Sequence, residues 1–488
     1  MPVHSGHVSS VPVPLTTRVD RPAGGRVSGS AMVVALGFSG AVMSLMHTLA
    51  IPLLPELPNL LGTSITATSW VATVTLVAGG VSTPVAGRMG DMYGKRRMTI
   101  ACLWISIAGS LVAALAPSLA MLLVGRVLQG LALGVIPLSL SILRDELPPE
   151  RLQRGVALLS AFMLGLGTGF GPLLMGGVLD AWGWHAVFWA VTVMSLMSLL
   201  LVLRLVPASP IRAPASFDIP GTFGLCATLV LLLVAITRGG EWGWSSPTIL
   251  ALLGGAAVLG TGWARWERRQ DAPLVDLEMT MRRPVLITHS AGVMVGFAMF
   301  AQYLASFSLV ALPAASGHGF GRSMLVAGLT QAPAAAVSLA AAPVAAKIAV
   351  ARGAKALLTV GSATVASGFV VGFLWHSELW HIALSAALIY FGAGLAYCAL
   401  PLLVMANVPL AETAAANAVN NLSRVIGSVV AAAVASAILA AALETFGEVE
   451  YPAVWAYGAI YLLGAVAAGG TALLARALPR LAAPSSAT

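Results

Sequence analysis

Four polar residues recur along one face of an apolar stretch near the end of the chain. Asn417, Asn420, Asn421 and Arg424 follow the i, i+3, i+4, i+7 spacing that places side chains on one side of an α-helix. Such a stripe is costly in contact with lipid, so it should line an internal cleft or form hydrogen bonds between helices. We expect Asn417 and Asn421 to line a substrate cavity.

A second arginine, Arg126, also lies within an apolar run. Gln129 and Gly130, three and four residues further on, share its helical face. An arginine inside a bilayer costs about 2.5–3.5 kcal/mol on insertion scales, so it must face protein or water and find a partner. One interpretation places Arg126 and Gln129 beside a polar cavity. The other is a structural arginine bonded to backbone carbonyls.

The first apolar run contains a histidine, His47, whose imidazole titrates near neutrality and could carry a proton. A structural histidine bonded to a neighbouring helix is the alternative interpretation. We place the adjacent Met46 in the cavity, although an adaptable methionine also suits a simple core. Amide and aromatic groups in an apolar cleft suit lipophilic substrates. On that ground we expect the cavity also to be lined by Gln302, Tyr303, Gln331 and Tyr397.

Other kinds of chemistry find no support in the sequence. It contains no phosphate-binding loop, no Ser/His/Asp set and no metal-ligand spacing, so we expect neither an enzyme nor a cofactor or metal. The three cysteines, Cys102, Cys226 and Cys398, fall in different apolar runs, where a disulfide framework has no geometry to form. The net charge of +8 is spread between apolar runs, which argues against a nucleic-acid surface.

Composition indicates what must position these residues. Of the 488 residues, 58% are hydrophobic and 9% are charged, and mean hydropathy is +0.91, which leaves too little polar surface for a soluble protein. At about 20 apolar residues per crossing, the chain has room for fourteen membrane-spanning helices. We place these crossings at 31–54, 68–87, 98–116, 119–143, 152–179, 184–206, 217–237, 247–264, 284–310, 323–347, 354–375, 379–405, 413–442 and 454–477.

The crossings divide the chain into five parts. We predict a disordered cytoplasmic tail over 1–30, a six-helix bundle over 31–206, two additional helices over 207–283, a second six-helix bundle over 284–477 and a cytoplasmic tail over 478–488. Loop bases favour the cytoplasmic side. With both termini there, Arg238 and Arg322 are the loop bases left on the outer side. The expected location is therefore the cell membrane, with both chain ends inside.

Between crossings two and three lies a segment of glycines and charges, which we interpret as a tight cytoplasmic turn. Its glycines let the backbone reverse, and one acid among bases can form or release ion pairs as bundles move. A similar string follows Pro343, with Gly353 in the place of Gly94, which indicates a duplicated unit. We predict a conformational switch formed by Gly87, Gly90, Asp91, Gly94, Lys95 and Arg96.

Crossing five is rich in glycine. Glycines at four-residue intervals bring helix backbones close together, and a proline adds a bend. Close packing without functional meaning is the alternative. The residues expected to form this packing surface are Gly167, Gly171, Pro172 and Gly176.

Three of these segments resemble motifs of the major facilitator superfamily. The turn is similar to its G-x-L-x-D-x-x-G-R-K loop, with Met89 in the leucine place, and crossing four resembles its fourth-helix arginine motif. Crossing five is similar to the antiporter motif G-x-x-x-G-P-x-x-G-G, with Met175 for one glycine. The resemblance covers about residues 31–477 and is closest to the fourteen-span drug:proton antiporters of the EmrB/QacA type. It implies proton coupling through Arg126 and Arg424, with His47 as a further candidate.

The resemblance has one departure. Those antiporters carry an acid in the first crossing, where this chain has Met46, and no Asp or Glu lies clearly inside any crossing. We therefore expect an all-α exporter of small lipophilic molecules that exchanges them for protons, acts as a monomer and contacts membrane lipid. The alternatives are an uptake symporter or an uncoupled facilitator on the same fold and, less favoured, a polytopic membrane enzyme or a sensor or scaffold.

Overall fold

A computed structural model describes residues 29–49, 53, 57–208, 217–446 and 449–478 of the chain. These residues are almost entirely helical, and 13 of their helices are long and apolar enough to cross a membrane. The described residues also contain one two-stranded antiparallel sheet, formed by β1 (Leu443–Phe446) and β2 (Val449–Pro452). The all-α fold predicted from composition is confirmed.

The first six apolar segments form what we call the N-terminal group. The fourth contains a 3₁₀ turn, η1, and the fifth contains a π-helical stretch, η2, over its glycine-rich part. The short helices α3 (Leu57–Leu61) and α4 (Ile65–Thr68) precede the second segment. The bounds are α1 Gly29–Thr48, α5 Trp70–Tyr93, α6 Lys95–Ala114, α7 Leu119–Leu131, η1 Ala132–Gly134, α8 Val135–Glu146, α9 Pro149–Ala161, η2 Phe162–Gly169, α10 Phe170–Trp182 and α11 Trp184–Leu205.

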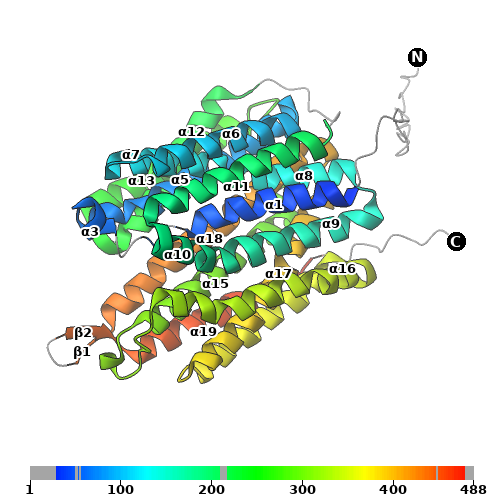
Figure 1. The fold of residues 1–488 in the computed structure, drawn as a ribbon. Coiled ribbons are helices and arrows are strands. Elements are labelled where there is room, and N and C mark those ends of the chain that lie inside the picture. Colours follow the sequence, from blue (N-terminus) through cyan, green and yellow to red (C-terminus); the bar gives the residue numbers. More distant parts are fainter. Residues whose placement is uncertain (1–28, 50–52, 54–56, 209–216, 447–448, 479–488) are drawn as a thin grey trace, which may run out of the picture.

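The remaining segments comprise an accessory pair and a C-terminal group. The two helices of the accessory pair, α12 and α13, pack against each other, and α12 also contacts α5 and α18. The bounds are α12 Ile219–Trp242 and α13 Pro247–Glu267 for the accessory pair, then α14 Leu277–Met281, α15 Arg283–Ala311, η3 Ala314–Ser316, α16 Met324–Leu374, α17 Leu379–Met405, η4 Leu410–Glu412, α18 Thr413–Ala441 and α19 Val454–Arg476. Helices α15–α19 form the C-terminal group, which lies beside the N-terminal group (Figure 1).

Helix α16 spans 51 residues, about 77 Å at 1.5 Å per residue, which is far more than one crossing needs. Gly353 interrupts it with φ 77° and ψ 171°, a conformation that suits glycine alone. The helix therefore contains two crossings that reverse direction at Gly353, and the described chain holds fourteen apolar segments. Gly94, between α5 and α6, also has a positive φ of 105°.

Replacing Gly353 by alanine is expected to lower the free energy of unfolding by about 1–3 kcal/mol, because a Cβ disfavours this backbone conformation. No atom lies within 4 Å of the position a Cβ would take, so the effect should come from the backbone alone. Thermal unfolding of the purified protein in detergent measures it. A melting temperature equal to that of Gly254→Ala, in the interior of α13, would contradict the expectation.

The two groups repeat the same close helix contact. A Cβ on Gly109 of α6 would lie 2.8 Å from the carbonyl oxygen of Gly125 in α7. In the C-terminal group, a Cβ on Gly392 of α17 would lie 2.5 Å from the carbonyl oxygen of Gly361 in α16. Both pairs join the third and fourth segments of their group. This correspondence supports the duplication inferred from the sequence.

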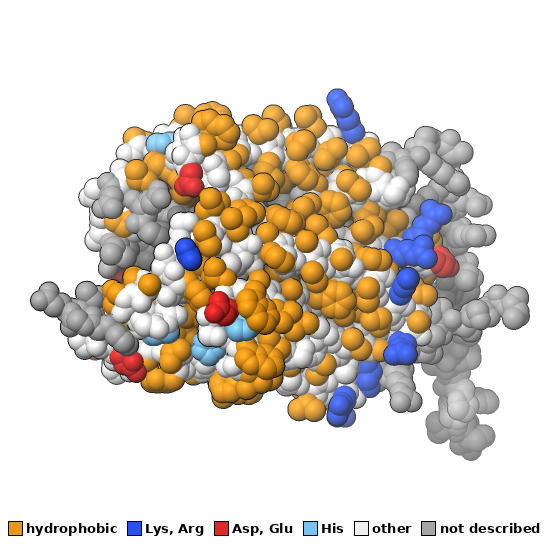
Figure 2. Space-filling model, turned by 60° about the horizontal axis from the view of Figure 1, so that its bottom comes forward, with side chains coloured by type: hydrophobic (Ala, Val, Ile, Leu, Met, Phe, Trp, Pro, Cys, Tyr) orange, Lys and Arg blue, Asp and Glu red, His pale blue; other side chains and the backbone are white. Residues whose placement is uncertain are grey.

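The surface divides into two charged ends and an apolar belt (Figure 2). The end at which α5 meets α6 carries exposed bases, and we call it the basic end. Its exposed bases include Arg97, Arg151, Arg154, Lys347 and Arg352. The opposite end carries exposed acids, including Asp180, Glu378, Glu444 and Glu450.

The structure departs from the sequence expectations at three places. The segment expected as a turn from Gly87 is helical up to Tyr93, so that expectation was wrong, and the reversal takes place at Gly94 alone. The β-hairpin after α18 was not predicted. Residues 1–28 and 479–488 of the expected tails lie outside the described residues, and Gly29 and Ser30 already belong to α1.

Candidate functional site: a cavity between the two helix groups

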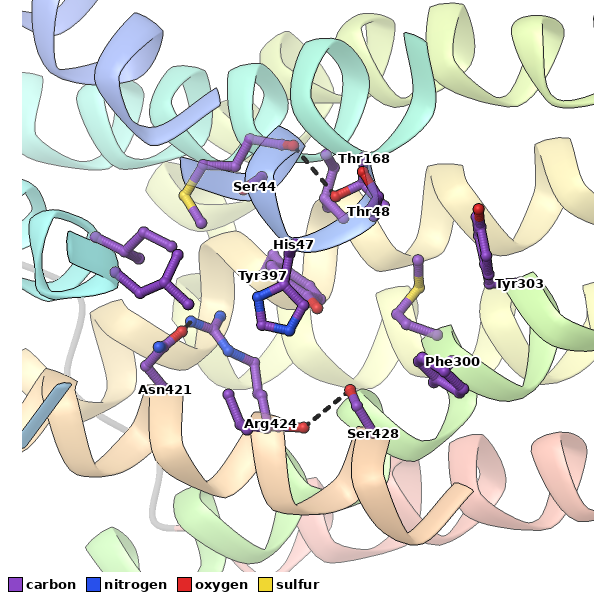
Figure 3. A pocket seen from close by; sticks show the side chains of 16 residues that line it. Ser44, His47, Thr48, Thr168, Phe300, Tyr303, Tyr397, Asn421, Arg424 and Ser428 are labelled. Carbon is purple, nitrogen blue, oxygen red and sulfur yellow. Dashed lines mark hydrogen bonds between the residues drawn. The ribbon is translucent and has the colours of Figure 1, made fainter. Parts of the chain in front are cut away.

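A cavity of about 140 Å³ lies between the N-terminal and C-terminal groups (Figure 3). It receives side chains from α1, η1, α8 and η2 on one side and from α15, α17 and α18 on the other. Pockets that hold drug-sized ligands measure about 300–1,000 Å³, so the cavity must widen before it accepts one. Its lining residues are Ser44, His47, Thr48, Leu133, Ile136, Met163, Leu164, Thr168, Met299, Phe300, Tyr303, Tyr397, Asn421, Arg424, Val425 and Ser428.

His47 and Arg424 point into this cavity from opposite groups (Figure 3). Arg424 donates from Nη2 to Asn421 Oδ1 at 2.8 Å, and its guanidinium carbon lies 4.6 Å from the centre of the Tyr397 ring. The Ser428 hydroxyl, one turn further along α18, donates to the carbonyl oxygens of Arg424 and Gly296. The polar stripe of α18 thus reaches the cavity through Asn421, Arg424 and Ser428.

Arg126 lies in a separate network inside the N-terminal group and is fully buried. It donates from Nε to the Val71 carbonyl at 3.2 Å and from Nη1 to the Met46 carbonyl at 3.1 Å. Nη1 also donates to Gln129 Oε1 at 2.8 Å, and Gln129 Nε2 donates to Ser110 Oγ at 2.9 Å. The bonds to backbone carbonyls match the structural interpretation of this arginine, because they tie α1, α5 and α7 together.

Only part of the expected lining reaches the cavity. His47, Tyr303, Tyr397, Asn421 and Arg424 line it. The fully buried Met46 instead turns toward α6, where its sulfur accepts a hydrogen bond from Ser106 at 3.6 Å. Gln302 donates to Ser306 at 2.7 Å, and Asn417 donates to the Thr413 carbonyl at 3.0 Å. The expected residues that are not among the lining are Met46, Gln129, Gln302, Gln331 and Asn417.

Sequence reasoning missed several hydroxyl groups in the cavity. Ser44 and Thr48 flank His47 on α1, Thr168 comes from η2, and Ser428 comes from α18. Ser428 continues the stripe that contains Arg424 by four residues, so one further helical turn would have identified it. Ser44, three residues before His47, carries the same spacing signal, whereas Thr48 and Thr168 carry none.

At the basic end, Asp91 of α5 joins the two groups. Its carboxylate accepts hydrogen bonds from the backbone N–H groups of Ala414 at 3.3 Å and Ala415 at 2.9 Å, in the first turn of α18. The N-terminus of a helix carries partial positive charge, so a carboxylate there is favoured. Lys95 lies 3.7 Å from Asp91 and donates to Asp145 at 2.8 Å.

Other contacts close the same end. Arg144 of α8 donates to the Thr413 hydroxyl at 2.6 Å and to the Val408 carbonyl at 2.9 Å. Gly87 lies so close to α18 that a Cβ there would be 2.7 Å from Ala418 Cβ and 2.8 Å from the Ala414 carbonyl oxygen. We call these contacts of Gly87, Asp91 and Arg144 with the α18 end the basic-end gate. The gate is closed in this structure.

The other predicted switch residues mainly contact the N-terminal group, although a Cβ on Gly90 would also lie 3.9 Å from Ala414 Cβ of α18. Gly90 faces Leu138, since a Cβ there would lie 2.1 Å from Leu138 Cδ2. Arg96 donates to the Leu203 carbonyl at 2.7 Å, which ties α6 to α11. Gly94 forms the reversal between α5 and α6.

The glycine-rich stretch of the fifth segment packs against helices of both groups. A Cβ on Gly167 would lie 2.6 Å from the Ala41 carbonyl oxygen of α1, and one on Gly171 would lie 2.5 Å from Leu45 Cδ1. A Cβ on Gly169 would lie 2.4 Å from Ala335 Cβ of α16, in the other group. No atom lies within 4 Å of a Cβ on Gly176, and Pro172 lies in α10.

Comparisons with known proteins agree with this architecture. A family model described as Major Facilitator Superfamily matches residues 36–432. The chain is 28% identical to an uncharacterized MFS-type transporter of Mycobacterium tuberculosis over 331 residues, which is 67% of this chain and 47% of that protein. It is also 28% identical to the tetracenomycin C resistance and export protein of Streptomyces glaucescens over 326 residues, which is 66% of this chain and 58% of that protein.

The chain therefore spans about half the length of the curated relatives it matches. Among solved structures, the human organic anion transporter MFSD10 shares the fold with a TM-score of 0.66 at 16% identity. That match covers 92% of this chain and 100% of the solved one.

Proposed function

This chain belongs to the major facilitator superfamily of multi-pass membrane transporters, and from that premise we propose that it exports small lipophilic molecules by alternating access. The observation that carries the proposal is the central cavity, which lies between two helix groups joined at the basic end by the gate. Opening the gate while the opposite end closes would expose the cavity to the other side of the membrane. The proposed function is export, and not the catalysis of a reaction.

We assign the basic end to the cytoplasm, because cytoplasmic loops carry an excess of Lys and Arg. The protein would then reside in the cell membrane with both termini inside. The accessory pair α12 and α13 supports a place among fourteen-span drug:proton antiporters of the EmrB/QacA type. We propose a monomer, embedded in membrane lipid.

The outward direction rests on two features, and the substrate class rests on the composition of the cavity. The glycine-rich fifth segment resembles the antiporter motif of exporters, and one relative carries export in its name. The cavity contains mostly apolar and aromatic side chains, with a few hydroxyl and amide groups. That mixture suits lipophilic molecules, which need few directed hydrogen bonds.

For the driving force we propose proton exchange that involves His47, Arg126 and Arg424. His47 is the cavity group whose ordinary titration lies nearest neutrality, while the two arginines fix positive charge on either side of it. Antiport requires that the proton and the substrate favour opposite conformations. A second candidate is export without proton coupling, and one observation favours it: among the described lining residues there is no Asp or Glu.

The experiment uses everted membrane vesicles with pH and potential clamped separately. Uptake of fluorescein or rhodamine 123, two lipophilic dyes on one ring system, reports export. If His47 carries the proton, His47→Ala should reduce dye-induced proton movement about tenfold or more, because His47 is the one imidazole among the described lining residues.

The matched control is His376→Ala, which removes an imidazole outside the cavity, where it contacts the Gly372 carbonyl. Proton movement that survives in His47→Ala would refute the role of His47. Export without any proton movement in the unmodified protein would establish the second candidate. Uptake of neither dye would overturn the proposed function.

A further inference from the structure

The cavity contains a cation, Arg424, that bonds to no carboxylate among the described residues. Arg424 is 6% exposed, and within the described residues its side chain contacts the Asn421 amide oxygen and the Tyr397 ring, both uncharged. Its Nε and Nη1 groups bond to none of the described residues. The N–H groups of Nε and Nη1 are thus left to donate to an acceptor on a ligand, and a carboxylate is an acceptor that an arginine binds strongly.

Among the described residues that line the cavity, the ionisable groups near Arg424 are bases or tyrosines and none is a carboxylate. On α1, His47 faces it across the cavity, and Arg126 donates to the carbonyl of the neighbouring residue, Met46. The described parts of η2, α8, α15 and α17 that line the cavity contribute no charged side chain. The acids Asp91 and Asp145 lie at the basic end, where they bond to α18 and Lys95.

An unpaired charge in a low-dielectric site raises the free energy of the protein. For the same reason, a buried ion pair is strongly destabilised when one partner is removed. The Tyr397 ring and the Asn421 oxygen stabilise a guanidinium only in part. The cavity therefore attracts an anion and repels a cation. This preference depends on the sign of the charge on the substrate and not on the chemical group that carries it.

We propose that the exported substrate carries an acidic group, a carboxylate or an ionised phenol or enol, which binds Arg424. Its apolar or aromatic body lies against Met163, Leu164, Met299 and Phe300, which line the same cavity. The proposal rests on the proposed function, because it names the substrate class of that site. It does not depend on which driving force operates.

An acidic substrate changes the driving force that export requires. The inside-negative membrane potential drives an anion outward by about fifty-fold per charge at 100 mV. A bound anion would also attract a proton on His47 rather than expel it. The inference therefore strengthens the second candidate, export without proton coupling, because the membrane potential could drive export through a cavity whose described lining holds no carboxylate.

The test compares fluorescein, an anion, with rhodamine 123, a cation on the same ring system, in proteoliposomes that contain the full chain and have a clamped potential. We expect fluorescein to be transported about tenfold faster or more than rhodamine 123. Arg424→Gln should reduce fluorescein transport by about tenfold or more. Arg424→Lys should retain part of it, because lysine keeps the positive charge but lacks the planar guanidinium with its several N–H donors.

A second variant tests the charge without removing the arginine. Asn421→Asp places a carboxylate where the amide oxygen lies 2.8 Å from Arg424, so it should reduce fluorescein transport about tenfold while nearly preserving shape. Asn407→Asp, at the basic end and outside the cavity, is the matched control and should change little.

Faster transport of rhodamine 123 would overturn the inference and leave the proposed function standing. The inference would also fall if fluorescein transport persisted in both Arg424→Gln and Asn421→Asp. Transport of neither dye would overturn both proposals.

Discussion

Replacing Gly87 by valine is expected to reduce transport by about tenfold or more, because the gate can no longer close. Even a Cβ at this position would lie 2.8 Å from the Ala414 carbonyl oxygen, and backbone atoms cannot yield as a flexible side chain does. Overpacking typically costs about 1–3 kcal/mol, and each 1.4 kcal/mol is a factor of ten in an equilibrium. The variant should therefore populate the state in which the basic end is open.

Dye uptake measures the loss of transport, and the distance between spin labels at Arg97 and Arg352 measures the opening. Both positions are exposed and lie at the basic end of different helix groups. The matched control is Gly254→Val in α13, where no atom lies within 4 Å of a Cβ. Unchanged transport and an unchanged label distance in Gly87→Val would show that α5 and α18 need not approach so closely.

Asp91→Asn should weaken the closed gate by about tenfold or more, with a matching loss of transport. The substitution keeps the shape of the side chain but removes the negative charge of the carboxylate to which the N–H groups of Ala414 and Ala415 donate. Hydrogen bonds to charged groups contribute about 1.5–3 kcal/mol, and the helix N-terminus adds a smaller term. The same label pair should report a larger open fraction.

Asp145→Asn is the comparison for this variant. Asp145 also pairs with Lys95, but that contact stays within the N-terminal group. Its loss should therefore shift the opening equilibrium less than the loss of Asp91. Equal shifts in the two variants would mean that the gate depends on Lys95 rather than on the contact between Asp91 and α18.

The helices themselves could be predicted because each is long, apolar and bounded by charges or glycines. For example, the crossing predicted over 379–405 is observed as Leu379–Met405. The end of α5 could not be predicted from its polar residues. Asp91 lies inside a helix because its carboxylate bonds to residues more than 320 positions away. Local sequence does not contain that partner.

The candidate site shows the same limit. Helical spacing identified the face that holds Asn421 and Arg424, because neighbours on one helix are fixed by its period. Spacing could not tell that Arg126 bonds to carbonyls of α1 and α5, or that Met46 turns toward α6. Those outcomes depend on how separate helices pack, which only the folded structure supplies.

The most direct test of alternating access follows two distances in the same protein. One label pair, at Arg97 and Arg352, spans the two groups at the basic end, and the other, at Asp180 and Ser377, spans them at the opposite end. Both should be measured by spin-label distance spectroscopy in lipid, with and without Asp91→Asn. Alternating access predicts that the first distance lengthens while the second shortens. Lengthening of both distances together, or a change in neither, would contradict it.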